Sequence, residues 1–588
     1  MEQLWHFKPH DERLVQLIEK QSKVSSLVAR LLASRNMTDP QAARDFLDAP
    51  LKNLQDPAEL SGANHAAREI HAAIRNQKKI VVHGDYDADG MTAAAIMVRC
   101  IKMLGGQVSY HVPNRLEEGY GLNEDSLRDL IQRGAALIIS VDCGIASVRE
   151  AALIKSLGAE LIITDHHQYG SELPQALAIV HPSLPADVYS HAPLCGAGVA
   201  FKVAWALCKQ ASGTDKVTAE HRDFLMSALA LAAIGTVTDV VPLVGENRII
   251  VRHGLHSLKK HPLPGLKQLM SLTGLNDKPA LCSEDIAFMI GPRLNAAGRL
   301  GQAQLGVELL VSDSAERTEA LAEYIENLNR SRDKIERSVY LAAAKQIKEM
   351  YSPETDPALV LDGRAWHAGV IGIVAGKIAE KYHTPTIMIS RAEMGNAPAI
   401  GSARSVGLID LHAALEHCSD YLLRHGGHAA AAGLQVDESQ IDAFREAFLE
   451  YVASESNVTE RSAKVSVDVE AIFSQLTLKA INEIEQLAPF GQANPRPIFC
   501  STNVMLAAPP KKIGGGERHL AIQFTQHGKR IRGVAFGKAE WADALTSLDD
   551  RIDVAYRPVI NEFRGRRSVE IQLVDWRPSR DTIATQCR

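Results

Sequence analysis

The sequence predicts a multidomain α/β protein in which two α/β regions are joined by a long helix and followed by a small antiparallel β-barrel. Its 588 residues exceed the roughly 250 to 300 that one hydrophobic core usually serves. Residues 65–245 alternate short β-branched runs with helical segments, a pattern typical of a buried parallel sheet covered by helices, and residues 355–455 return to a mixed α/β pattern. After residue 463 the pattern changes to alternating strands joined by Gly-containing turns, which is typical of a barrel.

The connecting helix is expected over residues 313–350, which contain neither Gly nor Pro and keep helical periodicity. At ~1.5 Å per residue this helix would be about 57 Å long, enough to connect two domains. Near the N-terminus, periodic leucines and a capped helix start at Asp39 before Pro40 indicate a helical segment. The predicted parts are a helical lead-in (1–60), a first α/β domain (61–245), a helical region with the connecting helix (246–350), a second α/β domain (351–457) and a barrel domain (458–588).

Composition favours a soluble globular protein. Hydrophobic residues make up 46% and charged residues 23%, which excludes disordered and fibrous classes. The N-terminus lacks a basic leader followed by an apolar core, and no apolar run reaches 18 residues, so we expect a cytoplasmic protein without membrane contact. The eight cysteines form no CxxC pair, which argues against a disulfide framework or a zinc knuckle.

The charge is distributed unevenly along the chain. The net charge is −6, which by itself makes nucleic acid an unexpected partner. Residues 496–588, however, hold 16 Lys and Arg against 10 Asp and Glu, so the C-terminal region is basic and the remainder acidic. This asymmetry permits a nucleic-acid surface at the C-terminal end.

Acidic and imidazole side chains follow the strands predicted in the first α/β region. The runs "KKIVVH", "ALIISV" and "ELIITD" each end in such residues, and we interpret "LAAIGTVTD" as a fourth strand of the same kind. The carboxyl ends of parallel strands share one edge of the sheet, so these side chains should converge there. The residues are His83, Asp85, Asp87, Asp89, Asp142, Asp165, His166, His167 and Asp239.

A cluster of this composition predicts a divalent metal site. Several carboxylates cannot stay ionised within a few ångströms of one another unless cations neutralise them. Carboxylates with imidazoles suit Mn²⁺ or Mg²⁺, and the number of donors favours two ions, an arrangement typical of phosphoester hydrolysis. Taken alone, "DADG" is more typical of a helix N-cap and "HH" of an ordinary surface or core pair, so the hypothesis depends on all the strand ends together.

The ordered motifs resemble a known family. "HGDYDADG", "VDCG", "TDHH" and "GTVTDVVP" resemble the motifs of the DHH phosphoesterase superfamily. Downstream, "GPRLNAAGR", "WHAGVIGIVAGKI", "GSARS" and "HGGHAAAAG" are similar in order and spacing to its RecJ family of bacterial single-strand-specific exonucleases. The resemblance runs from about residue 60 into the barrel, and as a set these motifs are highly specific.

The resemblance implies a role for each residue of the cluster. Asp142 would bridge the two ions, and Asp85, Asp165 and His167 would support catalysis by orienting ligands and by stabilising charge on the phosphorane oxygens. A water activated between the ions would attack phosphorus in line. The implied metal ligands are Asp87, Asp89, Asp142, His166 and Asp239, with His83 as a further candidate.

The second α/β region resembles the DHHA1 domain, and the barrel resembles an OB fold. By resemblance, Arg299, Ser402 and Arg404 would hold the 5′ phosphate of the substrate, with Ser402 and Arg404 on a Gly-flanked loop and His428 facing the substrate. For "HGGHAAAAG" the alternative is a Gly-rich strand-to-helix turn. In the barrel, basic residues beside Phe524, Phe536, Tyr556 and Phe563 suit stacked single-stranded DNA, although arginines at barrel turns are also often only solvated. The predicted DNA-binding residues are Arg530, Arg532, Arg564, Arg566 and Arg567.

Together these features predict a metal-dependent exonuclease that degrades single-stranded DNA from the 5′ end to nucleoside monophosphates, in DNA repair and recombination. Polarity, sugar preference and pathway follow from the resemblance alone, as do a single-strand-binding protein and a helicase as candidate partners; we expect a monomer. One alternative is a DHH-family phosphoesterase with a smaller substrate, such as an oligoribonuclease, a cyclic-dinucleotide phosphodiesterase or a manganese pyrophosphatase. Another is a non-catalytic single-strand-binding scaffold.

Overall fold

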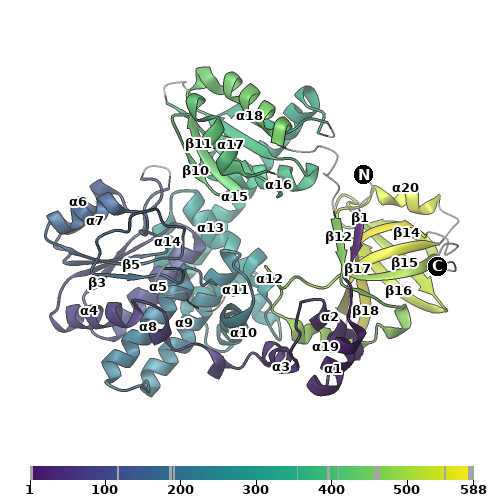
Figure 1. The fold of residues 1–588 in the computed structure, drawn as a ribbon, viewed down its shortest axis with the longest axis horizontal. Coiled ribbons are helices and arrows are strands. Elements are labelled where there is room, and N and C mark those ends of the chain that lie inside the picture. The colour runs from purple at the N-terminus through teal and green to yellow at the C-terminus, as the bar shows by residue number, and fades with distance from the viewer. Residues whose placement is uncertain are drawn as a thin grey trace. The chain divides into compact units, whose positions relative to one another are not determined.

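The computed structural model describes two compact units, one of residues 51–461 and one that combines residues 1–50 with 462–588. Figure 1 shows their helices and strands. No described helix is long and apolar enough to cross a membrane. The described residues are 4–115, 118–184, 189, 193–353, 355–393, 397–407, 409–455, 464–547, 551–563 and 565–579.

The first sheet confirms the predicted buried parallel sheet. Its strand order is β3-β2-β4-β5-β6, and every neighbouring pair is parallel. All residues of β2 and β4 are buried, as their β-branched composition requires of strands covered on both faces. The strands are β2 (Ile80–Gly84), β3 (Val108–His111), β4 (Leu137–Val141), β5 (Glu160–Thr164) and β6 (Ala178–Val180).

Helices on this sheet form the largest hydrophobic core of the chain. The helix of residues 88–103 has Asp87 as its N-cap, and the Asp87 carboxylate accepts hydrogen bonds from the first amides of the helix. The apolar side chains of this helix pack against the long helices of residues 196–212 and 219–238. The helices of this region are α4 (Ala63–Arg75), α5 (Ala88–Met103), α6 (Glu124–Gln132), α7 (Val148–Ser156), α8 (Gly196–Ser212) and α9 (Ala219–Thr238).

The following helical region extends the same core. Residues between Ile250 and Ile325 contribute side chains that pack with those of α5, α8 and α9. The predicted connecting helix is present as α15 (Ala315–Met350), 36 residues that begin at an N-cap, Ser314. The other helices are α10 (Gly245–Lys260), α11 (Pro264–Leu272), α12 (Ser283–Asp285), the π-helix η4 (Ile286–Ile290), α13 (Gly291–Arg299) and α14 (Ala303–Val311).

The second sheet is mixed, with strand order β10-β11-β9-β8-β7 and only the β7–β8 pair parallel. The C-terminal half of α15 and α16 pack on one face, and α17 and α18 pack on the other. The elements are β7 (Leu359–Arg364), α16 (Ala368–Tyr382), β8 (Thr386–Arg391), β9 (Ala399–Arg404), α17 (Leu411–His417), β10 (Arg424–Gly427), β11 (Ala431–Val436) and α18 (Ile441–Glu455).

The other unit confirms the barrel. Its strand order is β13-β14-β15-β16-β18-β17, and pairing of β14 with β17 closes the sheet. The hairpins are antiparallel as predicted, and two parallel pairs, β13 with β14 and β16 with β18, lie beside them. The elements are β12 (Lys464–Val467), β13 (Val469–Glu470), α19 (Leu478–Ile484), β14 (Phe499–Ile513), β15 (His519–Gln526), β16 (Lys529–Ala535), α20 (Trp541–Thr546), β17 (Ile552–Phe563) and β18 (Arg566–Pro578).

The N-terminal segment packs with the barrel. Leu31, Leu32 and Phe46 share a hydrophobic core with Phe499 and Phe524 of the barrel. A strand that the sequence analysis did not predict, β1 (Leu4–Phe7), pairs in parallel with β12. The three helices are α1 (Glu12–Ser22), α2 (Ser26–Ala33) and α3 (Pro40–Asp48), the last capped by Asp39 as expected.

Candidate active site

Three segments of the first sheet bring acidic residues to one edge. Asp85 directly follows β2, Asp142 follows β4 and Asp165 follows β5, as the sequence predicted. Asp239 differs from the prediction because it is the C-cap of helix α9 and follows no strand. Its run, "LAAIGTVTD", is helical because it is buried among α5, α8 and α10 as the end of a 20-residue helix, and short apolar runs do not distinguish strand from buried helix.

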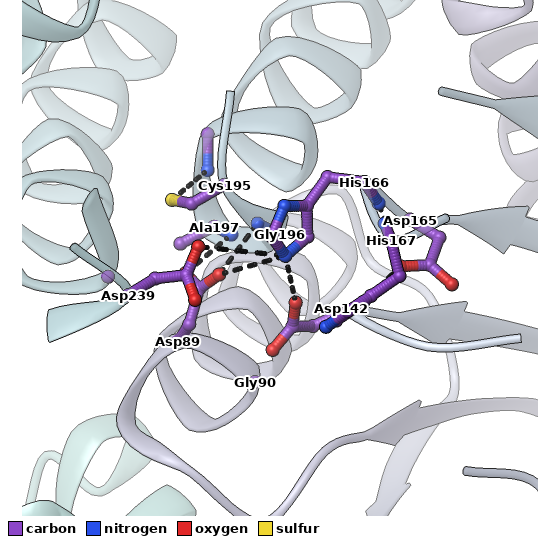
Figure 2. A network of polar contacts seen from close by, with 12 residues as sticks. Asp89, Gly90, Asp142, Asp165, His166, His167, Cys195, Gly196, Ala197 and Asp239 are labelled. Carbon is purple, nitrogen blue, oxygen red and sulfur yellow. Dashed lines mark hydrogen bonds and ion pairs between the residues drawn. The ribbon is translucent and has the colours of Figure 1, made fainter. Parts of the chain in front are cut away.

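His166 lies at the centre of the cluster. Figure 2 shows its imidazole between Asp142 on one side and Asp89 with Asp239 on the other. Its Nε2 atom lies 3.1 Å from Asp142 Oδ1, 3.7 Å from Asp239 Oδ2 and 3.9 Å from Asp89 Oδ2. His166 therefore belongs to two groups of possible metal donors, one with Asp89 and Asp239 and one with Asp142 and His167.

Backbone amides hold the Asp89 carboxylate in place, next to that of Asp142. Asp89 accepts hydrogen bonds from the amides of Gly196 and Ala197 at 2.7 and 2.9 Å, at the N-terminus of α8. A Cβ atom at position 196 would lie 2.3 Å from Asp142 Oδ1, so only glycine fits between these carboxylates. Asp142 itself has a φ of 62°, a conformation that non-glycine residues rarely adopt and that often occurs at functional sites.

Asp87 combines the two interpretations of the "DADG" motif. Its Oδ1 accepts hydrogen bonds from the amides of Asp89 and Gly90 at 2.9 and 3.0 Å and thereby caps α5. Asp87 also lies in a group with Asp85 and Asp142 whose donor atoms are within 4.8 Å of one another. The cap therefore orients the carboxylate without removing it from the cluster.

Burial and mutual repulsion raise the pKa values of the clustered carboxylates. Burial and the neighbouring Asp89 and Asp87 raise the pKa of Asp142 well above its usual range, and burial and Asp87 do the same for Asp85. The same causes raise the pKa of Asp239 to about 8. Such shifts mean that the carboxylates are not ionised together without added positive charge.

His167 and Asp165 form a pair beside the cluster. Asp165 Oδ1 lies 2.8 Å from His167 Nδ1 and accepts hydrogen bonds from the amides of His166 and His167. Burial alone would lower the pKa of His167, but the contact with Asp165 outweighs it and raises the pKa to about 9. The Tyr120 hydroxyl, which the sequence analysis missed, lies 3.1 Å from His167 Nδ1.

His83 lies outside all three groups of candidate metal donors found among the described residues. Its buried ring packs 5.1 Å from that of His111, and burial lowers its pKa to about 3. Its Nε2 atom is buried without a hydrogen-bond partner. The structure thus separates His83 from the donors around His166, and its role as a ligand stays a prediction.

A cluster of arginines is built around the first turn of α16. Arg299, at the end of α13, donates from Nη1 to the Gly369 carbonyl at 3.0 Å. Burial and the positive charges of Arg115, Arg332 and Arg404 lower the pKa of Arg299 to about 10. Arg404 Nη1 in turn donates to Ser402 Oγ at 3.1 Å. Arg299, Ser402 and Arg404 are therefore brought together, and close cationic groups of this kind favour a bound anion.

Two details of this region differ from the predictions. Ser402 and Arg404 lie on strand β9, where both faces of the sheet are occupied by packed side chains, and no loop is formed there. His428 lies in the tight turn between β10 and β11, with its amide bonded to Ala431, because these Gly- and Ala-rich segments pair as an antiparallel hairpin. Ala431 is the register partner of Arg404, so the exposed His428 stays near this cluster.

The predicted DNA-binding arginines of the barrel are exposed where the structure describes them. Arg532 pairs with Glu570 at 2.8 Å, and Arg567 donates to Asn482 at 3.2 Å. Arg530 and Arg566 are also exposed, whereas Arg564 lies outside the described residues. Two of the proposed stacking residues cannot have that role: Phe524 and Tyr556 are fully buried, because their strand faces point into the barrel core.

Family models match three parts of the chain. They describe the N-terminal domain of the DHH family (residues 79–236), the DHHA1 domain (355–454) and the RecJ OB domain (467–575). The matches agree with the parallel sheet, the mixed sheet and the barrel.

Known relatives match nearly the whole chain. The single-stranded-DNA-specific exonuclease RecJ of Bacillus subtilis is 36% identical over 571 residues, 97% of this chain and 70% of the relative. The RecJ of Escherichia coli is 34% identical over 94% of this chain and 95% of its own length. The crystal structure of RecJ from Thermus thermophilus in complex with Mn²⁺ superimposes with a TM-score of 0.82 at 30% identity, covering 98% of this chain and 80% of that one.

Proposed function

The chain belongs to the RecJ family, and on this premise we propose that it is a metal-dependent exonuclease that hydrolyses single-stranded DNA. Digestion would proceed from the 5′ end to nucleoside 5′-monophosphates, in DNA repair and recombination. The observation that carries the proposal is the group of carboxylates around His166, with no cationic side chain among the donor atoms of the described cluster.

The residues of this cluster fit two divalent cations. Asp142 Oδ1 and His166 Nε2 lie 3.1 Å apart, but neither atom forms a hydrogen bond of normal geometry and both are buried, which is costly unless another group binds them. Carboxylate oxygens and a neutral imidazole are donors that Mn²⁺ and Mg²⁺ accept. Asp142 would serve both ions, because it belongs to two of the donor groups. The residues that would hold the ions are Asp87, Asp89, Asp142, His166 and Asp239.

When bound, the ions would neutralise the carboxylates, polarise the scissile phosphodiester and activate the attacking water. The chain's own part is to hold the donors in fixed positions. The amides of Gly196 and Ala197 fix Asp89, and the amides of Asp89 and Gly90 fix Asp87. Because these contacts are formed before substrate arrives, little reorganisation is needed during the reaction.

His167 and Asp165 are assigned to the developing negative charge. Asp165 orients the imidazole through the 2.8 Å contact, and Tyr120 contacts the same ring. His167 is thereby held next to His166, with its donor atoms near Asp142. In this position it can donate a hydrogen bond to a phosphoryl oxygen as that oxygen gains charge. Asp85 is assigned a supporting role beside Asp87 and Asp142.

The arginine cluster is assigned the choice of strand end from which digestion proceeds. Arg299, Ser402 and Arg404 would bind the 5′ terminal phosphate or its neighbour, with His428 nearby, because a guanidinium group can bind phosphate through two parallel hydrogen bonds. Exposed arginines of the barrel would bind the phosphates of the strand. A cytoplasmic location, a monomeric state, and contacts with a single-strand-binding protein and a helicase stay predictions.

Digestion of end-labelled strands tests the proposal. Single strands labelled at the 5′ or the 3′ end are incubated with Mn²⁺, Mg²⁺ or chelator, next to duplex DNA and dinucleotides. We expect early release of 5′ label as mononucleotide, only with metal and only from single strands. Preferred cleavage of dinucleotides would instead indicate a small-substrate phosphoesterase, and binding without cleavage a scaffold.

A further inference from the structure

The buried face of α15 changes from apolar to polar in the middle of the helix. Ile325 belongs to the hydrophobic core of the first α/β region, and Val339 belongs to a core on one face of the second sheet. Residues three or four positions apart lie on the same face of a helix, and between these two residues that face carries Asn329, Arg332 and Glu336. Buried polar groups cost free energy unless they are paired, so the partners of these side chains indicate what this part of the helix does.

Glu336 pairs with cations from two helices. Its side chain is only 8% exposed, and its Oε2 accepts a hydrogen bond from Arg332 Nη1, one turn earlier in α15, at 2.9 Å. Its Oε1 accepts a hydrogen bond from Lys377 Nζ on α16. Both oxygens of this one buried carboxylate are therefore occupied, and together they link α15 to α16.

Arg332 depends on this carboxylate. Its Nη2 lies 2.7 Å from Asn329 Oδ1 and 2.8 Å from Asp333 Oδ1, whereas its Nε is buried without a hydrogen-bond partner. Asp333 is 59% exposed, so water screens its charge more than that of Glu336. The positive charge of Arg332 also helps to lower the pKa of Arg299. Glu336 is therefore the buried negative charge that balances Arg332 beside the arginine cluster.

Helix α16 touches both halves of the arginine cluster. A Cβ atom at position 369 would lie 2.3 Å from the Arg299 carbonyl oxygen. A Cβ atom at position 372 would lie 2.9 Å from Ser402 Oγ and 3.0 Å from Arg404 Nη2. The face of α16 that carries Gly369 and Gly372 thus fits directly against the end of α13 and against β9. A shift of this helix would separate the groups that it holds together.

The pair of Glu336 and Lys377 constrains α16 in a way that its apolar contacts do not. Val370, Ile371 and Val374 of α16 pack in the same core as Val339 of α15. Hydrophobic contact keeps the helices close, but it is not directional. A charge-assisted hydrogen bond is directional. Lys377 lies about 12 Å further along α16 than Gly369, so the helix is fixed at its first turn and at a second, distant point.

We propose that Glu336 is a positioning residue: through Arg332 and Lys377 it holds α16 where the arginine cluster can bind the terminal phosphate of the strand. Glu336 is buried and acts through its partners, without contact with the substrate. The inference rests on the proposed function and deepens it, because it names what keeps the phosphate-binding groups of two elements in register.

Steady-state cleavage of 5′-phosphorylated and 5′-hydroxyl single strands with Mn²⁺ tests the proposal. Glu336→Gln should raise KM for the 5′-phosphorylated strand about 2- to 30-fold with kcat nearly unchanged, and the preference for this strand should fall by a similar factor. Lys377→Met should act in the same direction by no more than about fivefold, because the Lys377 side chain is 56% exposed. Lys377→Arg keeps the pair and should behave like the parent.

The two variants distinguish position from charge. Glu336→Gln adds one positive charge to the region, and Lys377→Met removes one. If Glu336 acted through its charge alone, Glu336→Gln would lower KM, since phosphate is an anion. A lowered or parental KM in this variant would overturn the proposal, as would an equal rise for both strands. The control is Glu349→Gln, the same change at a 61% exposed position of α15, which should leave KM and the preference unchanged.

Two further measurements keep the outcome decisive. Thermal unfolding shows whether each variant is folded, and if Glu336→Gln is not, Glu336→Asp replaces it. This variant keeps the charge but shortens the side chain by one methylene, so KM should again rise, and a parental KM would overturn the proposal. Fluorescence anisotropy in chelator compares binding of the two strands without cleavage. If the parent does not cleave, the proposed function fails, and an unchanged 5′-phosphate preference of Glu336→Gln in this binding assay would separately overturn the present proposal.

Discussion

The two α/β sheets of residues 51–461 carry clusters of opposite charge. Carboxylates gather around His166 at the edge of the first sheet, and arginines gather around α16 beside the second. A phosphodiester is an anion, so the arginines attract it unaided, whereas the carboxylates repel it until cations are bound. We therefore expect substitutions in the carboxylate cluster to abolish most of the cleavage activity, and substitutions in the arginine cluster to weaken substrate binding by smaller, graded amounts.

The largest expected effect is at Asp142, which belongs to two of the three groups of candidate metal donors among the described residues. Asp142→Ala should lower kcat by at least about 10²- to 10³-fold, the loss typical of removing one group that stabilises the transition state. Single-turnover cleavage of a labelled strand measures the effect. Asp215→Asn, which changes a fully exposed carboxylate of the same unit, is the control and should cleave normally. Parental rates in Asp142→Ala would mean that the carboxylate cluster is not the catalytic centre.

Removal of metal should make stability depend on pH. A pKa raised in the folded state, such as that of Asp239 at about 8, stabilises the fold at low pH, and this contribution is lost as pH rises through about 8. Chelated protein should therefore melt at lower temperature at pH 8 than at pH 6, by at least about 2 to 4 °C. Excess Mn²⁺ should reduce the difference, since a ligand of the folded state stabilises it. Scanning calorimetry at both pH values, with chelator and with Mn²⁺, measures the melting temperatures. If the change of melting temperature with pH were the same with and without metal, repulsion among the carboxylates would not be its cause.

A smaller, graded effect is expected at the arginine cluster. Arg404→Lys keeps the positive charge but loses bidentate phosphate binding, so KM for a 5′-phosphorylated strand should rise about tenfold with kcat nearly unchanged. The preference over a 5′-hydroxyl strand should fall by a similar factor. Arg424→Lys, on strand β10 of the same sheet, changes an exposed arginine and serves as the matched control. If KM rose equally for the 5′-phosphorylated and the 5′-hydroxyl strand, Arg404 would not bind the terminal phosphate.

The smallest effect is expected at the barrel. Changing Arg566 and Arg567 together to Gln should reduce the salt slope of DNA binding by about 1 to 2 and lower affinity modestly at moderate salt. Adding Arg564→Gln should extend the effect if this third arginine also contacts the strand. Lys479→Gln, which changes an exposed cation of the same unit, should leave the slope unchanged. An unchanged slope in the arginine variants would place the strand elsewhere on the protein.

Sequence reasoning identified the carboxylate cluster because its members follow buried strands. Asp85, Asp142 and Asp165 come directly after β-branched runs, and the geometry of a parallel sheet then requires that they converge. The prediction that Asp239 joins the cluster agrees with the structure, but the predicted strand before it is a helix. An apolar run of nine residues does not reveal whether it is helical. Its position at the end of a helix still directs its carboxylate to the same cluster.

Other features of the site and of the fold are not marked by a pattern in the sequence. The amides of Gly196 and Ala197 that hold Asp89 belong to the backbone, and any residue type provides an amide. Tyr120 approaches His167 from a segment without periodic pattern, and β1 pairs with a strand more than 450 residues away. The burial of Phe524 and Tyr556 follows from closure of the barrel, which period-two alternation alone does not define.

The shared core of the N-terminal helices and the barrel has a consequence for synthesis of the chain. Leu31 and Leu32 emerge from the ribosome early, but the barrel residues that cover them, such as Phe499 and Phe524, emerge hundreds of residues later. At ~5 to 20 residues per second the apolar faces of α2 and α3 stay uncovered for roughly half a minute or longer. During that interval the first α/β region can fold, while the N-terminal helices need protection from aggregation.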